Sequence, residues 1–311
     1  MSSMAIVGAG FVGRAWALVF ARAGWHVQVS EPGDQVRQQL PALLKTMAEE
    51  LVAAGLALDA ETITARIRIF DRLEDALQGV SFVQESGPEL VEIKQAIFAE
   101  LDRLAPPDAI LASSSSAIVA SRFSEALPGR ARCLIGHPVN PPHLVPVVEL
   151  CGAPWTSSKA VARARDIYHS VGQVPVTVNR EIEGFVLNRL QAVVLTEALR
   201  LVADGVVSPQ DLDHTMKDGL GLRWSFMGPF ETIELNAPGG IADYAGRYGP
   251  TFARIAADVP DADVWTPAKI ERLVAAWGKP DAASLKAKID WRDKTLAALM
   301  AHKQSNEKPP G

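Results

Sequence analysis

The sequence predicts an α/β domain with a mostly parallel β-sheet, followed by an all-α domain. Two observations support this fold class. Up to about residue 180, short apolar runs that are typical of buried strands alternate with helical patterns. From Ile182 onward the patterns are helical only. A chain of 311 residues has room for two domains, and we expect them to span residues 1–180 and 181–311.

The first strand, turn and helix form a recognisable unit. Residues 4–7 are apolar and predict a strand, and residues 14–23 predict a helix. Between them lies Gly8-Ala9-Gly10-Phe11-Val12-Gly13, whose glycine spacing in this context is typical of a Rossmann-type dinucleotide-binding fold. The first glycine permits a tight turn, the second lets the backbone approach a pyrophosphate, and the third lets the helix and strand pack closely.

A second strand, predicted at residues 25–29, ends close to Glu31. This acid follows the glycine turn by about 20 residues, where a carboxylate would hold the ribose hydroxyls of NAD. The same carboxylate would repel the 2′-phosphate of NADP, and Pro32 and Gly33 bring no cation to neutralise it. We therefore expect an NAD site that includes Gly8, Gly10, Phe11, Val12, Gly13 and Glu31.

The rest of the first domain continues the alternation. Residues 35–55 predict a long helix, in which Pro41 is expected to mark a break or an early position. Helices are also predicted at residues 90–104 and 159–171. Further strands are predicted at residues 68–70, 80–84, 109–112, 133–136, 147–150 and 174–178. This order favours a mostly parallel sheet that helices cover on both faces.

The second domain is predicted to be helical. Residues 185–204 have apolar side chains on or near one face of a long helix. Ser208-Pro209 is a typical helix start, with serine as the N-cap and proline at the first position. Thr266-Pro267 predicts another helix, and residues 285–302 predict a final one.

Composition and charge narrow the classes of partner. The net charge of −5 and the absence of a basic stripe argue against nucleic acid. The longest apolar stretches are too short to cross a membrane, and from the first residues we expect no cleavable leader. Cys133 and Cys151 lack the spacing of metal ligands and are interpreted as reduced thiols. We expect a cytoplasmic protein without metal, membrane or nucleic-acid partners.

A base is needed if the nicotinamide is to oxidise an alcohol, and histidine is the commonest such base. Among six histidines, His137 ends a predicted strand, at the edge where open α/β sheets bind ligands. The segment that follows, Pro138-Val139-Asn140-Pro141-Pro142, is rigid. His143 lies close by in the sequence and is the alternative candidate for the base.

Several motifs together resemble one known family, the 3-hydroxyacyl-CoA dehydrogenase superfamily, and within it the λ-crystallin branch, the L-gulonate 3-dehydrogenases. Besides the glycine turn they are Ala112-Ser113-Ser114-Ser115-Ser116, His137-Pro138-Val139-Asn140-Pro141-Pro142, Val148-Glu149-Leu150, Gly184-Phe185-Val186-Leu187-Asn188-Arg189-Leu190, Val207-Ser208-Pro209-Gln210-Asp211-Leu212-Asp213, Gly219-Leu220-Gly221-Leu222-Arg223 and Trp291-Arg292-Asp293. The resemblance covers nearly the whole chain. It implies that the helical domain mediates a homodimer and closes the active-site cleft.

The resemblance also implies roles for individual residues. His137 matches the catalytic histidine, and Glu149 matches the acid that pairs with it. Ser116 matches the serine that bridges the substrate oxygen and the nicotinamide, and Asn188 matches the asparagine that donates to the substrate. Three further positions match residues that contact or lie near the cofactor: Glu89, Lys94 and Asn140.

The expected reaction is NAD-dependent oxidation of a 3-hydroxy acid to the 3-oxo acid, with L-gulonate or a similar free hydroxy acid as substrate. Arg223 and Trp224 lie in a glycine-to-Met-Gly-Pro turn longer than that of typical acyl-CoA members, and an arginine fork binds a carboxylate bidentately. The main alternative substrate is a 3-hydroxyacyl-CoA such as 3-hydroxybutyryl-CoA. Carnitine, diketo esters and a crystallin-like structural role stay open.

Overall fold

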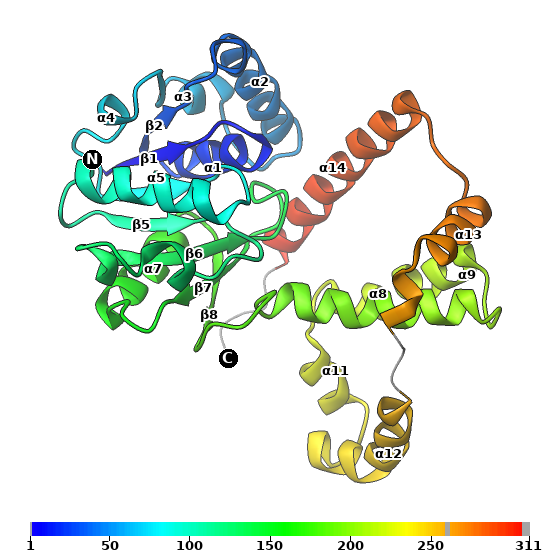
Figure 1. Cartoon of the computed structure of the whole chain (residues 1–311). Coiled ribbons are helices and arrows are strands. Elements are labelled where there is room, and N and C mark those ends of the chain that lie inside the picture. Colours follow the sequence, from blue (N-terminus) through cyan, green and yellow to red (C-terminus); the bar gives the residue numbers. More distant parts are fainter. Residues whose placement is uncertain (1, 259–261, 307–311) are drawn as a thin grey trace. The chain divides into compact units, whose positions relative to one another are not determined.

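A computed structural model describes residues 2–258 and 262–306 of the chain (Figure 1). The chain divides into two compact units. The first comprises the described residues up to Arg189 together with those from Ile289 onward, and the second comprises Leu190–Lys288. The predicted fold class is confirmed: an α/β sandwich forms the first unit, and helices form the second.

The first unit is built on one eight-stranded sheet with the order β3-β2-β1-β4-β5-β6-β7-β8. All eight predicted strands are confirmed. They are β1 (Ser3–Val7), β2 (His26–Ser30), β3 (Ile67–Phe70), β4 (Phe82–Glu85), β5 (Ile110–Ser113), β6 (Cys133–Pro138), β7 (Val147–Gly152) and β8 (Val174–Val178). Neighbouring strands run parallel except β6 and β7, which are antiparallel.

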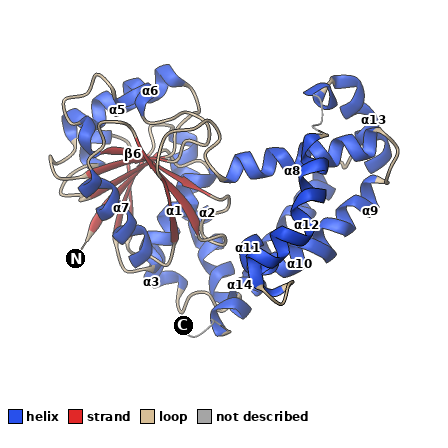
Figure 2. Ribbon diagram, turned by 90° about the horizontal axis from the view of Figure 1, so that it is seen from below, coloured by secondary structure: helices blue, strands red, loops and turns tan. Residues whose placement is uncertain are grey.

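Helices cover both faces of this sheet, and each face has its own apolar core (Figure 2). These helices are α1 (Phe11–Arg22), α2 (Asp34–Ala53), α3 (Ala60–Thr64), α4 (Leu73–Ala76), α5 (Val91–Leu104), α6 (Ser121–Ser124), the 3₁₀ turn η1 (Arg130–Arg132) and α7 (Ser158–Ser170). One core contains Trp16, Phe20 and Tyr168, and the other contains Phe98, Phe123 and Phe185.

The expectation that Pro41 marks a break or an early position was wrong, because α2 begins at Asp34, two turns earlier, and continues through the proline. Proline removes one backbone hydrogen bond from a helix. The helix persists here because Leu40 and Leu44 are buried on either side of the proline, and packing of an apolar face contributes more to helix stability than local propensity does.

The second unit contains helices throughout its described part. They are α8 (Leu187–Ala203), which begins in the first unit, α9 (Pro209–His214), the π-helical turn η2 (Thr215–Leu220), α10 (Gly221–Trp224), α11 (Pro229–Leu235), α12 (Gly240–Ala257), the 3₁₀ turn η3 (Ala262–Trp265), α13 (Pro267–Trp277) and α14 (Ala282–Ser305), which continues into the first unit. The predicted start at Ser208 is confirmed, since its hydroxyl accepts the Asp211 amide. Among the described residues, no helix is both long and apolar enough to span a bilayer.

A polar network ties β4, β6 and the first residue after β5 to α7. The Tyr168 hydroxyl donates to Gln84 Oε1. Gln84 Nε2 in turn donates to Ser114 Oγ at 2.7 Å and to the Gly136 carbonyl at 3.2 Å. Tyr168 and Gln84 are both fully buried, so the network holds Ser114, which follows β5, and Gly136, which precedes His137 within β6.

We expect Tyr168→Phe to lower the free energy of unfolding by about 1–3 kcal/mol, because it leaves the buried Gln84 oxygen without a donor. Urea unfolding measures this change. The matched control is Tyr248→Phe, since Tyr248 is 46% exposed and its substitution should change stability by less than about 0.5 kcal/mol. Equal effects of the two substitutions would contradict this assignment.

Candidate active site

The antiparallel pairing of β6 and β7 brings a histidine and a glutamate together. In this register His137 lies directly opposite Glu149. His137 Nδ1 and Glu149 Oε2 are 2.8 Å apart, and both residues are at least nine-tenths buried. His137 and Glu149 thus form a hydrogen-bonded pair across these two strands, near the C-terminal end of β6.

The other oxygen of Glu149 accepts hydrogen bonds from the start of α8. The backbone amides of Val186 and Leu187 donate to Glu149 Oε1 at 2.8 and 2.9 Å. Burial alone would raise the pKa of Glu149, but the hydrogen bonds from His137, Leu187 and Val186 outweigh it and hold the pKa below its ordinary value. The carboxylate is therefore ionised at neutral pH and acts only as an acceptor.

This ionisation fixes the histidine tautomer. Because ionised Glu149 can only accept, His137 Nδ1 must donate to it. Whenever the ring is neutral, the other nitrogen, Nε2, therefore carries no proton and can accept one. A neutral imidazole with an unprotonated nitrogen is what a general base requires.

A turn before α8 supports this arrangement from the other side. Gly184 and Phe185 have φ angles of +74° and +48°, and the second value is rare for a residue with a side chain. The Phe185 side chain is fully buried, and its ring centroid is 5.6 Å from that of His137. The turn therefore aims two amides at Glu149 and packs an aromatic ring beside the imidazole; the sequence analysis assigned no role to Phe185.

The serine loop after β5 is held by Glu89 and Asn188. Glu89 Oε1 accepts from Ser115 Oγ at 2.5 Å and from the amides of Ser116 and Ala117 at 3.0 and 2.9 Å. Burial would raise the pKa of Glu89, but these hydrogen bonds and the charge of Lys94 keep it below its ordinary value. Asn188 Nδ2 donates to the Ser116 carbonyl at 3.0 Å.

Lys94 is fully buried and pairs with a residue that the sequence analysis missed. Its Nζ is 2.9 Å from Glu85 Oε2 and 3.7 Å from Glu89 Oε2. Glu85 is fully buried too, and it accepts from Ser113 Oγ at 2.5 Å and from the Gly87 amide at 2.6 Å. A lone acid at the end of an apolar strand was the available signal, because a buried charge requires a partner.

One cavity of about 280 Å³ lies over these strand ends. Five of the residues that line it were given a site role in the sequence analysis, namely Val12, Glu89, Ser116, His137 and Asn140. Its lining consists of Val12, Ser86, Gly87, Glu89, Ser114, Ser116, His137, Pro138 and Asn140. The candidate base His137, Ser116 and Val12 of the glycine turn therefore line one cavity.

Two other candidates lie elsewhere. His143 lines a different cavity, and burial lowers its pKa to about 4. Arg223 lies in α10 of the second unit and is exposed. Neither residue lines the cavity that contains His137.

The glycine turn fits a dinucleotide. A Cβ atom on Gly13 would lie 1.9 Å from the Gly8 oxygen, so only glycine permits this close packing. Gly8 has φ +95°. A Cβ on Gly10 would meet no atom within 4 Å, so the backbone there faces open space at the start of α1. Such an exposed helix N-terminus suits a pyrophosphate.

Glu31 lies next to the glycine turn and is hydrogen-bonded to it. Its two carboxylate oxygens accept the amides of Ala9 and Gly33, each at 2.9 Å. Arg37, the nearby cation, donates to the carbonyl oxygens of Glu31 and Pro32 and pairs with Asp34. The negative charge of Glu31 therefore stays at the glycine turn.

Comparison with known families agrees with this geometry. Residues 3–182 match the model of the NAD-binding domain of 3-hydroxyacyl-CoA dehydrogenase. Residues 184–284 match the model of the C-terminal domain of the same enzyme. The chain belongs to the 3-hydroxyacyl-CoA dehydrogenase family. It is an NAD-dependent oxidoreductase of this family.

Individual relatives of this family member are similar over most of their length. A λ-crystallin homologue from Bos taurus is 43% identical over 303 residues, which cover 95% of this chain and 94% of the relative. An L-carnitine dehydrogenase from Streptomyces coelicolor is 36% identical over 267 residues, which cover 84% of this chain and 83% of the relative. One similar solved structure is 5-formyl-3-hydroxy-2-methylpyridine 4-carboxylic acid 5-dehydrogenase, described as an NAD⁺-dependent dismutase. It superposes with a TM-score of 0.86 at 27% sequence identity, and the match covers 99% of this chain and 100% of the other.

The charge of Glu31 generates a prediction about cofactor choice. We expect kcat/KM to be much lower with NADP than with NAD, because like charges in contact cost several kcal/mol at a partly dry site. Glu31→Ser should raise the ratio of the NADP value to the NAD value. Steady-state kinetics with both cofactors measure this ratio, and comparable wild-type values would contradict the prediction.

Proposed function

We propose that this family member oxidises a free 3-hydroxy acid to the 3-oxo acid, with L-gulonate as the first candidate substrate. The hydrogen bond between His137 and Glu149 beside Ser116 is the observation that carries this proposal. A neutral imidazole held in one tautomer can take the proton of a substrate hydroxyl.

We assign the steps as follows. His137 Nε2 accepts the hydroxyl proton as the carbon–hydrogen bond breaks, and Glu149 stabilises the imidazolium that forms. Ser116 holds the substrate oxygen. Asn188 fixes the serine loop, because its side-chain amide donates to the backbone carbonyl of Ser116. NAD, when bound, supplies the acceptor for the hydride. Substrate donation by Asn188 itself stays a prediction.

The residues that would hold the cofactor follow from the cradle. The open backbone at Gly10 and the N-terminus of α1 would receive the pyrophosphate. Glu31 would bind the adenosine ribose, and Asn140 and Glu89, which line the cavity with His137, would lie near the nicotinamide. Lys94 acts on this site indirectly, because its ammonium reaches Glu85 and Glu89.

The relatives support a free acid as substrate. L-carnitine, named in the dehydrogenase that is 36% identical, is itself a 3-hydroxy acid with a free carboxylate. The λ-crystallin homologue belongs to the branch that the motifs resemble. The family description favours the alternative, a 3-hydroxyacyl-CoA such as 3-hydroxybutyryl-CoA.

The two cysteines support the cytoplasm as the location, because Cys133 and Cys151 are both buried free thiols.

A substrate panel tests the function. We expect NADH absorbance to rise with L-gulonate or L-carnitine, and His137→Gln to lower kcat by about two to four orders of magnitude while NADH still binds. His143→Gln is the matched control and should keep its activity, because His143 lies in another cavity. An inactive His143→Gln and an active His137→Gln would overturn the assignment of the base.

Arg223 tests the choice between free acid and thioester. If its guanidinium binds the substrate carboxylate, Arg223→Met should raise KM for L-gulonate about tenfold or more, with KM for NAD unchanged. Arg254→Met, on α12 of the same unit, is the matched control. A wild-type enzyme that turns over 3-hydroxybutyryl-CoA well and ignores L-gulonate would replace the free-acid proposal with the acyl-CoA alternative.

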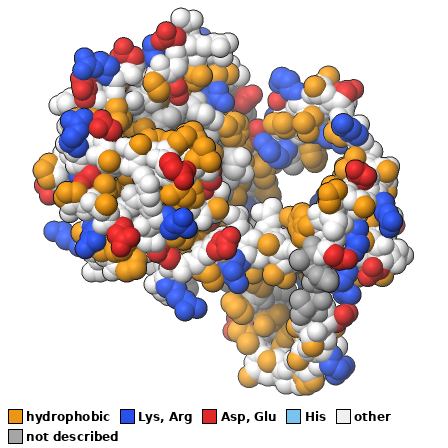
Figure 3. Space-filling model, in the orientation of Figure 1, with side chains coloured by type: hydrophobic (Ala, Val, Ile, Leu, Met, Phe, Trp, Pro, Cys, Tyr) orange, Lys and Arg blue, Asp and Glu red, His pale blue; other side chains and the backbone are white. Residues whose placement is uncertain are grey.

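We also infer a homodimer formed through the second unit. Its surface carries large apolar side chains that are mostly exposed, and Figure 3 shows many hydrophobic side chains over this unit. Phe230, Val193 and Leu235 are each about two-thirds or more exposed, which is typical of an interface. Light scattering after gel filtration should give twice the chain mass of 33.4 kDa, and a monomer at micromolar concentration would contradict this inference.

A further inference from the structure

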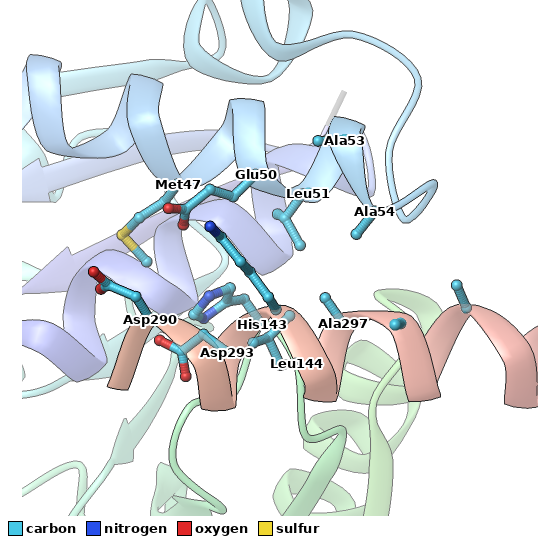
Figure 4. Close-up of a pocket in the computed structure, with 13 residues that line it drawn as sticks. Met47, Glu50, Leu51, Ala53, Ala54, His143, Leu144, Asp290, Asp293 and Ala297 are labelled. Carbon is cyan, nitrogen blue, oxygen red and sulfur yellow. The ribbon is translucent and has the colours of Figure 1, made fainter. Parts of the chain in front are cut away.

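A second and larger cavity lies in the first unit, between α2 and the C-terminal half of α14. Its volume is about 630 Å³, within the range of small-molecule sites. It is lined by Met47, Glu50, Leu51, Ala53, Ala54, His143, Leu144, Asp290, Asp293, Lys294, Ala297, Ala298 and Ala301. Figure 4 shows Met47, Glu50 and Leu51 on one wall, Asp290, Asp293 and Ala297 on the other, and the His143 ring between them.

This cavity is distinct from the one that contains His137. The two share no lining residue. Its α14 wall, at residues 290–301, lies beyond residue 284, where the match to the family's C-terminal domain ends. The two cavities are close along the chain, because only Pro141 and Pro142 separate Asn140 in one from His143 in the other.

The buried imidazole of His143 points to a ligand. His143 is 7% exposed, and its Nδ1 has no hydrogen-bond partner among the described residues. Buried polar atoms in folded proteins are nearly always paired, so an unpaired one requires an explanation. Burial, the main cause, lowers the pKa of His143 to about 4. The ring is therefore neutral at pH 7 and offers one nitrogen that lacks a partner.

Much of the cavity lining is apolar. Leu51, Leu144 and Ala297 are almost fully buried. Across from α2, the helix α14 presents only alanine side chains over its last turns in the cavity, at Ala297, Ala298 and Ala301. These small side chains leave the space that larger residues would fill.

The surrounding charges do not favour a charged ligand at His143. The charge of Asp293 raises the pKa of His143, whereas the charges of Arg22 and Arg292 lower it. Asp293 is paired with Arg292 at 2.7 Å, and Glu50, Asp290 and Lys294 complete the lining. The three acids outnumber the one lysine, so an anion would lose its hydration and meet net negative charge, while a cation would find Asp293 already paired with Arg292. A hydroxyl can donate or accept, so it satisfies either tautomer of the ring.

We propose that this cavity is a binding site, separate from the NAD site, for an uncharged, mainly apolar molecule whose hydroxyl pairs with His143 Nδ1. The proposal does not depend on which hydroxy acid the enzyme oxidises, because it rests on other residues.

Titration with 2-naphthol, an uncharged aromatic alcohol, tests the proposal through the fluorescence of the probe. We expect saturable binding at one site per chain, both with and without saturating NADH. 2-Naphthoate, which has the same ring system and a negative charge, should bind much more weakly. His143→Leu should weaken 2-naphthol binding about two- to tenfold, the range for one neutral hydrogen bond.

Two substitutions on α14 locate the binding site. Ala301→Phe places a large side chain in the cavity and should abolish binding. Leu299→Phe is the matched control, because Leu299 is exposed on the same helix and does not line the cavity. Circular dichroism and NADH binding verify that each variant is folded. Binding that persists in Ala301→Phe, is displaced by NADH, or is stronger for 2-naphthoate would overturn the proposal.

Discussion

The carboxylate of Glu149 joins three parts of the first unit. One oxygen accepts from His137 on β6, and the other accepts from the amides of Val186 and Leu187, where α8 begins. A buried carboxylate is costly unless its hydrogen bonds are satisfied, and here three donors satisfy it. The antiparallel register of β6 and β7 is what makes this contact possible, because it sets Glu149 directly across from the histidine. The start of α8 is thus hydrogen-bonded to the same carboxylate that accepts from the candidate base His137.

A second buried carboxylate supports the other side of the same cavity. Glu85 receives the ammonium of Lys94, the hydroxyl of Ser113 and the amide of Gly87. Removal of one partner of a buried pair leaves an uncompensated charge, which is strongly destabilising. The serine loop and the turn after β4 therefore depend on the pair of Glu85 and Lys94, although neither residue lines the cavity. The polar groups of both segments are bonded to acids, to buried Glu85 at Gly87 and Ser113 and to Glu89 at Ser115 and Ser116.

The sequence predicted the fold well where local chemistry decides it. Apolar runs located all eight strands, and the cap at Ser208 located a helix start. Local patterns failed where packing decides, as at Pro41, which α2 accommodates. They could not pair Lys94 with Glu85, because that contact depends on how α5 lies against β4. They also left His143 as a rival base, since only the fold shows that two neighbouring histidines line separate cavities.

The tautomer of His137 is the most direct test of how Glu149 organises this site. Nitrogen-15 NMR of the histidine side chains reports which ring nitrogen carries the proton, and the spectrum of His137→Gln assigns the signal. At a pH where the ring is neutral, we expect Nδ1 to be protonated and Nε2 to be free, because ionised Glu149 can only accept. A wild-type ring protonated at Nε2 would contradict the proposed role of Glu149 and the assignment of Nε2 as the base.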